Sequence, residues 1–267
     1  MPYDVLTPLK WNGEAVEQYQ TILTEFSNQV LLVTMNRIER HNALNSVLNH
    51  ELGKAISDAS NQDVNAIVIT GAGEKAFCAG GDMLEMSGIE AIDTGLPPQA
   101  ERLNGITELG QTSIPTIAAV NGYCYGGGAR LAIGCDIRIA SSSATFRLPG
   151  AEYGLVVAAS TLPRLVGAAK AKEWILTGQR VDAEEALRWG LVNSVSDPSD
   201  LLADALRMAT TIASNSKVAV ENSKRIIDMA TLSEEADTSE VSINKELRGS
   251  PEQAERFRSA TRKVTGR

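Results

Sequence analysis

The sequence predicts an α/β fold from three observations. Apolar runs rich in β-branched residues recur through the first two thirds of the chain, which is typical of buried strands. Between these runs, apolar residues recur at spacings of three or four, which indicates amphipathic helices. The last third shows helical patterns alone. Strands that alternate with helices favour stacked layers of helix and sheet over an all-helical or all-strand architecture.

Four strands and the helices between them can be placed. The expected strands are residues 30–35, 66–70, 116–120 and 137–140. Asn45 or Ser46 can cap a helix after the first strand. The apolar face of that helix is formed by Leu48, Leu52, Ile56 and Ala59. Three glycines at positions 126–128 are expected to open a further helix that continues through residues 131–133.

Strand signals weaken from about Ala183 onward. Helices are expected at residues 183–189, 201–213, 218–229 and 252–263. We therefore divide the chain into a core, residues 1–200, and a C-terminal helical region, residues 201–267. The second region is too short to bury a strong core alone, so it is expected to pack on the core or on another subunit. Residues 1–20 are polar and irregular and are expected to form a loosely held arm.

Composition and charge argue against several classes of function. The 267 residues carry a formal net charge of −8 and 4% aromatic residues, which disfavours a nucleic-acid surface or an anionic membrane as partner. We expect no signal peptide, and no run reaches the roughly 18 apolar residues of a membrane helix. The three cysteines form no CxxC pair, so a cytoplasmic location is expected and Cys78 is interpreted as a packed residue rather than a reactive thiol.

Two glycine-containing turns carry the chemistry that the sequence indicates. They span residues 75–82 and 121–129, and each follows an apolar strand. A glycine-rich turn that leads into a helix exposes backbone N–H groups, and the helix dipole adds positive potential there. Such a turn suits a phosphate or an oxyanion, and the first turn can supply a second N–H donor.

Other ligand-binding motifs do not fit these glycines. A phosphate-binding P-loop needs a lysine in register, where this chain has Ala129 and Arg130. A dinucleotide fingerprint needs a third glycine where Leu131 stands. The chain has no G-x-S-x-G elbow and two histidines, His41 and His50, so neither a Ser/His/Asp hydrolase nor a His/Cys metal site is expected.

Three ordered blocks resemble those of the crotonase (enoyl-CoA hydratase/isomerase) superfamily. Residues 76–82, which read Ala-Phe-Cys-Ala-Gly-Gly-Asp, are similar to its first signature. Residues 114–137, which include the glycine cluster, are similar to its second, and residues 176–193 to its third. The order and spacing hold from about residue 21 to residue 265.

The resemblance implies a crotonase-type spiral of ββα repeats with a C-terminal helical trimerisation region. It implies a homotrimer or a dimer of trimers. It also implies an acyl-CoA substrate, with coenzyme A bound as part of that substrate, no covalently bound cofactor and no metal ion. Neither nucleic acid nor a membrane is an expected partner.

The resemblance also assigns roles to residues of the two turns. The thioester oxygen is expected to accept hydrogen bonds from the backbone N–H groups of Ala79 and Gly127. Asp82 is expected to close the first turn without taking part in the reaction. The other expected contacts with coenzyme A lie in the first turn and in a loop at residues 37–45, and they are Arg40, His41, Ala43, Gly80, Gly81 and Asp82. For Arg40 and His41, two interpretations have equal weight: contact with the nucleotide part of coenzyme A, or a solvated position on the surface.

The chain departs from the hydratases of this family at two positions. Hydration needs two carboxylates, one that positions water and one that assists proton transfer. The two positions that hold these carboxylates in the hydratases are occupied by Arg130 and Gly150 in this chain. Neither residue can act as a general base. The aspartate of dienoyl-CoA isomerases would fall near Ala158. We therefore expect no efficient hydratase activity, and prefer isomerase, hydrolase or decarboxylase-type chemistry on a stabilised enolate or tetrahedral oxyanion.

Nearby residues offer substitutes for the missing carboxylates. Glu152 and Tyr153 are the nearest candidates. Three acidic residues after the first motif are weaker ones: Glu85, Glu90 and Asp93. Arg130 is expected either to pair with a carboxylate such as Glu152 or to bind a carboxylate or carbonyl of the substrate. The alternatives to an enzyme are a non-catalytic acyl-CoA-binding or scaffold member and a subunit of a larger complex.

Overall fold

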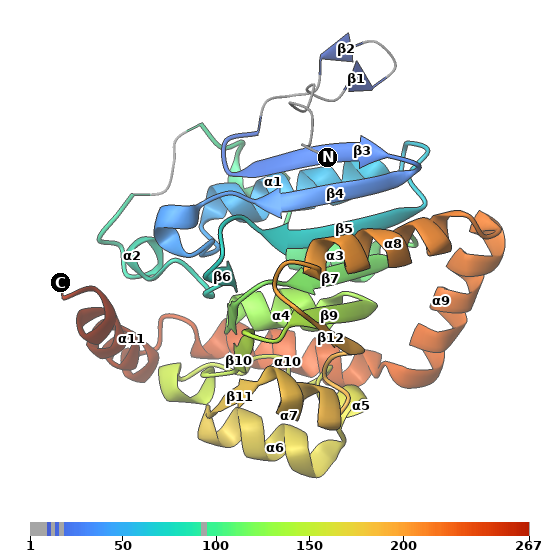
Figure 1. The fold of residues 1–267 in the computed structure, drawn as a ribbon. Coiled ribbons are helices and arrows are strands. Elements are labelled where there is room, and N and C mark those ends of the chain that lie inside the picture. Colours follow the sequence, from blue (N-terminus) through green and yellow to red (C-terminus); the bar gives the residue numbers. More distant parts are fainter. Residues whose placement is uncertain (1–9, 12–13, 16–18, 92–94, 267) are drawn as a thin grey trace.

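The larger of two principal sheets has six strands. The computed structural model describes residues 10–11, 14–15, 19–91 and 95–266 (Figure 1). The strand order in this sheet is β12-β9-β7-β5-β4-β3. The bounds are β3 Ile22–Ser27, β4 Val30–Met35, β5 Ala66–Gly71, β7 Thr116–Val120, β9 Ile137–Ser141 and β12 Ser194–Ser196. Within this sheet β3 pairs with β4 antiparallel, and the other neighbours are parallel.

A smaller sheet of four short strands lies beside it. Its order is β11-β10-β8-β6, and its strands are β6 Ala76–Cys78, β8 Tyr123–Tyr125, β10 Thr145–Arg147 and β11 Arg180–Asp182. Each of β5, β7 and β9 is followed by one strand of this sheet and then by helical turns, which include α2 Met83–Met86 and α4 Gly127–Gly134. This repeat confirms the expected spiral of ββα units.

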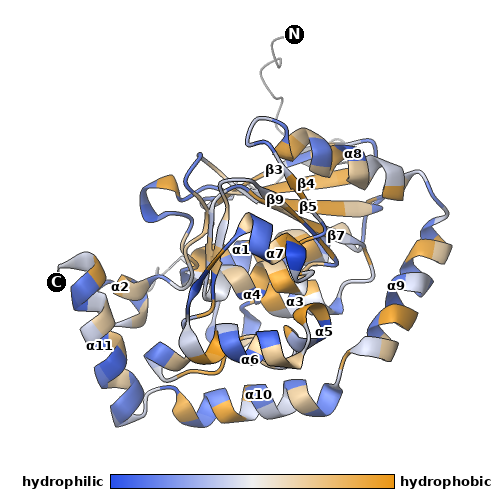
Figure 2. Cartoon of the chain, turned by 60° about the horizontal axis from the view of Figure 1, so that its bottom comes forward, coloured by the Kyte–Doolittle hydropathy of each residue, from blue (hydrophilic) through white to orange (hydrophobic). Residues whose placement is uncertain are grey.

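Both faces of the larger sheet are covered, which explains why its central strands β5 and β7 are mostly apolar. Every residue of β5 and β7 is buried. Alternate residues of the sheet face two different layers, because successive side chains in a strand point to opposite sides. One layer contains α1 Ser46–Ala59, α3 Gly105–Gln111 and α4, and the other is α8 Leu201–Ala213. In Figure 2 the strands appear as a hydrophobic layer inside these helices.

The four strands and most of the helices expected from the sequence are confirmed. Asn45 caps α1, and its side chain accepts a hydrogen bond from Leu48 N. The later helices α7 Ala183–Arg188, α9 Lys217–Thr231 and α11 Pro251–Thr265 begin and end within two residues of expectation.

Several elements were not expected. They include β3, β12, the short strands of the smaller sheet, α2, α3, α5 Pro163–Val166, α6 Ala168–Thr177 and α10 Glu234–Leu247. The short strands span three residues, too few to give a detectable period. In α10 the buried residues are polar, Glu240 and Asn244, so no apolar stripe marks it.

The first twenty residues are described in part. Lys10–Trp11 and Glu14–Ala15 pair antiparallel as β1 and β2. The backbone N–H groups of Gln20 and Thr21 donate to the Glu51 carboxylate, at 2.7 and 2.8 Å. The expected loose arm otherwise falls on residues 1–9, 12–13 and 16–18, which lie outside the described residues.

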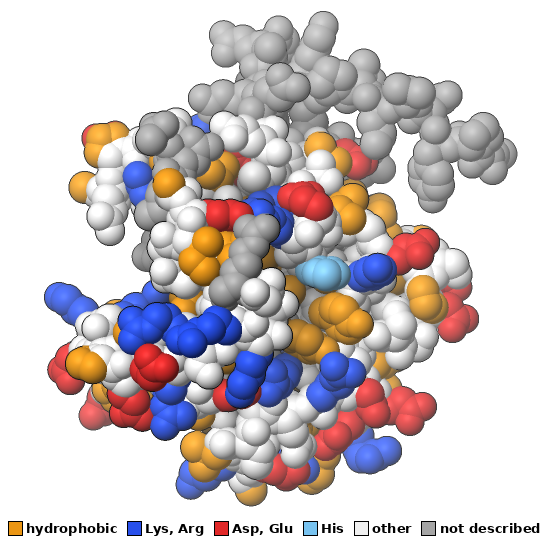
Figure 3. Space-filling view, turned by 90° about the vertical axis from the view of Figure 1, so that its left-hand side faces the viewer, with side chains coloured by type: hydrophobic (Ala, Val, Ile, Leu, Met, Phe, Trp, Pro, Cys, Tyr) orange, Lys and Arg blue, Asp and Glu red, His pale blue; other side chains and the backbone are white. Residues whose placement is uncertain are grey.

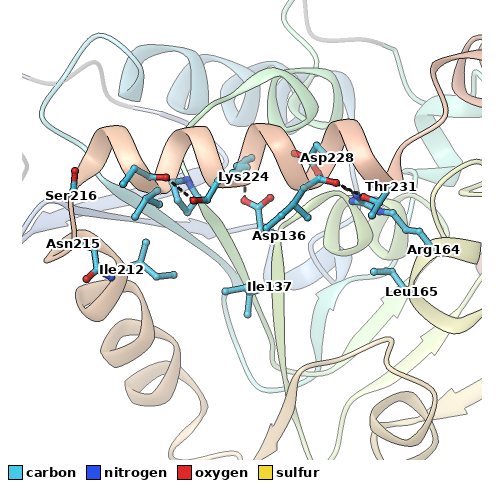
Figure 4. A pocket seen from close by; sticks show the side chains of 15 residues that line it. Asp136, Ile137, Arg164, Leu165, Ile212, Asn215, Ser216, Lys224, Asp228 and Thr231 are labelled. Carbon is cyan, nitrogen blue, oxygen red and sulfur yellow. Dashed lines mark hydrogen bonds and ion pairs between the residues drawn. The ribbon is translucent and has the colours of Figure 1, made fainter.

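The C-terminal region packs on the core mainly through α8. Residues at spacings of four on α8, namely Leu201, Ala205, Ala209 and Ala213, are buried against the larger sheet. In contrast, α9 has no buried residue. Two ion pairs connect it to the core, Lys224–Asp136 at 2.9 Å and Arg164–Asp228 at 3.2 Å. Beneath α9 they border a cleft of about 760 Å³ with an apolar lining that includes Ile137 and Leu165 (Figure 4).

Two further properties concern the described part of the chain. None of its helices combines the length and the apolar composition needed to cross a membrane. Within the same residues, no three His, Cys, Asp or Glu side chains lie together as a set of metal ligands.

All three cysteines lie in the core. Cys78, Cys124 and Cys135 are buried and unbonded to one another. Burial raises the pKa of Cys78 and of Cys135 to about 12, and it raises that of Cys124 well above the ordinary value. The thiols are therefore protonated at neutral pH, which agrees with Cys78 as a packed residue.

The folded protein is expected to resist alkylation. Iodoacetamide reacts with the thiolate, and burial removes both the thiolate and access to it. Near pH 8, mass spectrometry should find no carbamidomethyl group on the native protein and three after unfolding in guanidinium. Labelling of native Cys78 at the rate of the unfolded chain would contradict this prediction.

Candidate active site

A loop at residues 37–45 is fixed onto the first glycine turn by buried polar side chains. Asn42 is 1% exposed, and its side-chain nitrogen donates to the carbonyls of Ala72 and Ala76 at 3.0 and 2.9 Å. Its oxygen accepts from Arg37 N at 3.0 Å. The Arg37 guanidinium pairs with Asp82 at 2.9 Å, and both side chains are largely buried. Loop and turn therefore form one rigid unit.

Most backbone polar groups of the first turn form hydrogen bonds with this loop. Ala79 N–H donates to the His41 carbonyl at 3.0 Å, and Asp82 N–H donates to the Leu44 carbonyl at 2.9 Å. The Gly80 carbonyl accepts from Leu44 N at 2.7 Å. Gly80 has a φ of +112°, a conformation that favours glycine. The Asp82 carboxylate caps α2 by accepting from the N–H groups of Leu84 and Glu85, in keeping with its expected role.

The second turn places the start of α4 against the first turn. Gly126 has a φ of +51°, and Gly127 is the first helical residue. A Cβ on Gly128 would lie 2.2 Å from the Cys78 carbonyl oxygen, so only glycine permits this approach. A Cβ on Gly127 would lie 3.5 Å from Gly81 N. Gly127 therefore faces Gly81 across the space between the two turns.

The free donors in this space are the N–H groups of Gly81 and Gly127. Within the described part of the chain, no acceptor is bonded to Gly81 N, and the first N–H of a helix has no intrahelical partner. The expectation for Ala79 differs from the structure, because its single N–H proton is bonded to His41. The Gly81–Gly127 pair, at the positive end of α4, is the arrangement that can bind an oxyanion.

Of the loop residues expected to contact coenzyme A, Arg40 and His41 lie near the surface and Ala43 does not. Arg40 pairs with Glu90 at 2.8 Å, and the hydrogen bond that the guanidinium donates to this carboxylate raises the pKa of Arg40. His41 is exposed, and its ring lies 6.3 Å from that of Tyr123. Ala43 is buried, and its carbonyl accepts from Arg37. Arg40 and His41 are thus near the surface, whereas Ala43 is part of the support.

The two candidate acid or base residues after Gly150, Glu152 and Tyr153, contact other side chains of the protein. Glu152 is paired with Arg147 at 2.6 Å and its side chain is 53% exposed. Tyr153 packs edge-on against Phe257 of α11, with ring centroids 6.1 Å apart, and burial raises its pKa. The expected pair of Arg130 with Glu152 does not form. Among the described residues, no carboxylate pairs with the partly exposed Arg130.

The acidic residues after the first motif are also engaged. Glu85 accepts from the N–H and hydroxyl of Ser46, at 2.9 and 2.6 Å, and so supports the start of α1. Glu90 is the partner of Arg40. Asp93 lies outside the described residues.

Position 150 has no room for a carboxylate. A Cβ on Gly150 would lie 2.7 Å from Val157 Cγ2 and 2.8 Å from the Leu155 carbonyl oxygen. The segment at residues 154–160 therefore occupies the space that a side chain would need. The hydratase pattern has a carboxylate at each of two positions. In this chain one position holds the guanidinium of Arg130, and the other holds Gly150, beside which no side chain would fit.

Two residues that the sequence reasoning missed hold this segment in place. The buried Glu240 carboxylate accepts from Ala158 N and Ser160 N, at 3.0 and 2.8 Å. Asn244 bonds both the N–H and the carbonyl of Val156. A signal was available, because Ser233 followed by acidic residues marks a helix start, and Ser233 does cap α10.

Basic side chains gather on the neighbouring surface. Figure 3 looks onto the side of the molecule that carries α2 and α11, and Lys and Arg side chains cluster there. The helix α11 carries four basic residues in its sequence, namely Arg256, Arg258, Arg262 and Lys263. Arg256 and Arg258 pair with glutamates of the same helix.

Comparison with known proteins identifies the family. Residues 25–264 match the family described as enoyl-CoA hydratase/isomerase. A short-chain-enoyl-CoA hydratase from Clostridium acetobutylicum is 41% identical over 221 residues, which cover 79% of this chain and 82% of that protein. The solved structure of a carnitinyl-CoA hydratase from Mycobacterium avium has a TM-score of 0.82 at 32% identity, covering 92% of this chain and 97% of that one.

A second solved structure agrees with this result. An enoyl-CoA hydratase/isomerase from Pseudoalteromonas atlantica has a TM-score of 0.81 at 33% identity, covering 91% of this chain and 98% of that one. With the ββα spiral and the paired glycine turns, these similarities lead to one conclusion: the chain belongs to the enoyl-CoA hydratase/isomerase family and has the crotonase fold.

Proposed function

We propose that this protein acts on acyl-CoA thioesters, and that the N–H groups of Gly81 and Gly127 hold the thioester oxygen. The observation that carries the proposal is the pair of facing backbone donors, to which no acceptor is bonded among the described residues. As negative charge develops on the thioester oxygen, in an enolate or a tetrahedral intermediate, these donors and the α4 dipole stabilise it.

We further propose that the reaction is not hydration. A hydratase needs a base to activate water, and Arg130 and Gly150 supply none. Glu85, Glu90 and Glu152 are committed to Ser46, Arg40 and Arg147. Isomerisation, thioester hydrolysis and decarboxylation use the same oxyanion-binding donors, and they remain the preferred reaction types.

The coenzyme A part of the substrate would lie along the loop at residues 37–45. Arg40 and His41 are basic side chains of that loop near the surface. The basic residues of α11 offer counter-charges for its phosphates, although the chain as a whole carries a net charge of −8.

We also propose that the protein assembles through the C-terminal region. The helix α9 carries exposed apolar residues: Val218, Ile226, Ile227 and Met229 are 53–69% exposed. An amphipathic helix without a buried face needs a partner surface.

The assembly is expected to be a homotrimer or a dimer of trimers. Light scattering after gel filtration should give three or six times the mass of one chain, and Ile227→Glu should lower that mass by placing charge in the interface. A monomer for the unchanged protein would refute this prediction.

Crotonyl-CoA is expected to be hydrated slowly. General acid–base catalysis contributes about 10²–10⁴-fold to a rate, so the loss should be of this order against a short-chain enoyl-CoA hydratase assayed in parallel. The loss of absorbance of the conjugated enoyl thioester measures it. Turnover equal to that of the parallel hydratase would show that another residue supplies the base.

The oxyanion site can be tested with two alanine substitutions on the same helix. In Gly127→Ala, the new Cβ enters the space between the donors, 3.5 Å from Gly81 N. In Gly134→Ala, the Cβ meets only the flexible Leu109 side chain. Both changes replace glycine by alanine at an end of α4. With a pooled acyl-CoA library and detection by mass spectrometry, Gly127→Ala should lose turnover and Gly134→Ala should keep it.

The outcomes of this assay separate the possible functions. If the unchanged protein consumes one thioester, its product names the reaction. If it binds thioesters but consumes none, the protein is a binding member on a catalytic scaffold. If Gly127→Ala consumes the same thioester at the same rate, the proposed donor pair is wrong.

A further inference from the structure

One face of α4 is open, and Arg130 lies on it. The helix residues Gly128, Ala129, Leu131, Ala132 and Ile133 are buried, whereas Gly127, Arg130 and Gly134 are partly exposed. These three positions are separated by three and four residues, so they lie on one face of the helix. Arg130 therefore follows the proposed donor Gly127 along the same open face.

The neighbours of Gly127 and Gly134 show what surrounds the open face of α4. From Gly127 the Cβ direction leads to Leu44 Cδ1 at 3.2 Å and Gly81 N at 3.5 Å. From Gly134 it leads to Leu109 Cδ2 at 3.1 Å. The side chain at position 130 thus begins between the donor pair and an apolar residue of α3. An acyl group held at the donor pair that extends along α4 passes Arg130.

Among the described residues, no carboxylate pairs with the guanidinium on this path. The carboxylates that surround the site are bonded elsewhere: Asp82 to Arg37, Glu90 to Arg40 and Glu152 to Arg147. Within the described residues, no hydrogen bond or ion pair to the Arg130 side chain is present. A partly buried guanidinium favours an anion, and its planar donors match a carboxylate.

We propose that Arg130 selects acyl-CoA substrates whose acyl chain ends in a carboxylate. This inference rests on the proposed function, because it assumes that the thioester oxygen is held by Gly81 and Gly127. Three residues of helix rise by about 4.5 Å, so the second carboxylate lies a few bonds from the thioester carbonyl. The substrate class is therefore a short dicarboxylic acid bound to coenzyme A through one of its ends.

The test compares two thioesters of equal chain length that differ in their ends. Succinyl-CoA carries the terminal carboxylate, and butyryl-CoA carries a methyl group in its place. Calorimetry gives the dissociation constant of each for the unchanged protein, Arg130→Gln, Arg130→Lys and Arg207→Gln. Arg207 lies on α8 with its side chain 72% exposed, so its substitution matches the change in net charge at a distance from the site.

We expect the unchanged protein to bind succinyl-CoA about ten- to a hundredfold more tightly than butyryl-CoA, the range of a charged hydrogen-bonded pair. Arg130→Gln should remove this preference and leave butyryl-CoA binding unchanged. Arg130→Lys should retain part of the preference, and Arg207→Gln all of it. Circular dichroism and thermal unfolding check that each variant is folded.

Three results would overturn the inference in distinguishable ways. If the unchanged protein binds both thioesters equally, the substrate class is wrong and the proposed function stands. If Arg130→Gln weakens both thioesters by the same factor, Arg130 contacts the coenzyme A phosphates or another shared group. If the unchanged protein binds neither, the proposed function fails as well.

Discussion

The contact between Gly128 and the Cys78 carbonyl is the constraint on which the site depends. The two backbones approach so closely that a Cβ at position 128 would lie 2.2 Å from the oxygen. This approach ties the start of α4 to the end of β6, and it leaves Gly127 facing Gly81. This close-packed backbone contact sets the separation of the N–H groups of Gly81 and Gly127. The two donors are therefore held in place without the movement of any side chain.

The segment at residues 154–160, which fills the space beside Gly150, depends on a distant part of the chain. Glu240 and Asn244 of α10 fix residues 156–160, and Phe257 of α11 packs on Tyr153. Burial of the Glu240 carboxylate is offset by two backbone donors, and hydrogen bonds to a charged group are among the strong ones. Ala158 is held at a φ of +57°, which costs energy for a residue other than glycine. The C-terminal region therefore fixes the segment that leaves position 150 without room for a side chain.

Local patterns predicted the parts of this structure that local physics determines. The central strands are apolar because both faces are covered, and Asn45 caps α1 because its side chain reaches Leu48 N. The glycines at residues 126–128 were predicted to open a helix, and α4 begins at Gly127, whereas the donor role of Gly127 was implied by the family resemblance. The role of Ala79 was not predictable, because it depends on whether its N–H meets the distant His41 carbonyl. The same holds for Glu240, whose partners lie about eighty residues away.

Oxyanion binding and substrate choice are separable in this architecture. The donors are backbone groups, held by glycine contacts that a substitution at position 130 leaves untouched. Arg130 contributes its N–H to the Gly126 carbonyl, as any residue there would. Position 150 is different, because Val157 and Leu155 fill the space beside it, and Glu240 and Asn244 hold their segment. A change of charge at 130 is therefore a local event, whereas a carboxylate at 150 requires the 154–160 segment and its α10 contacts to move together.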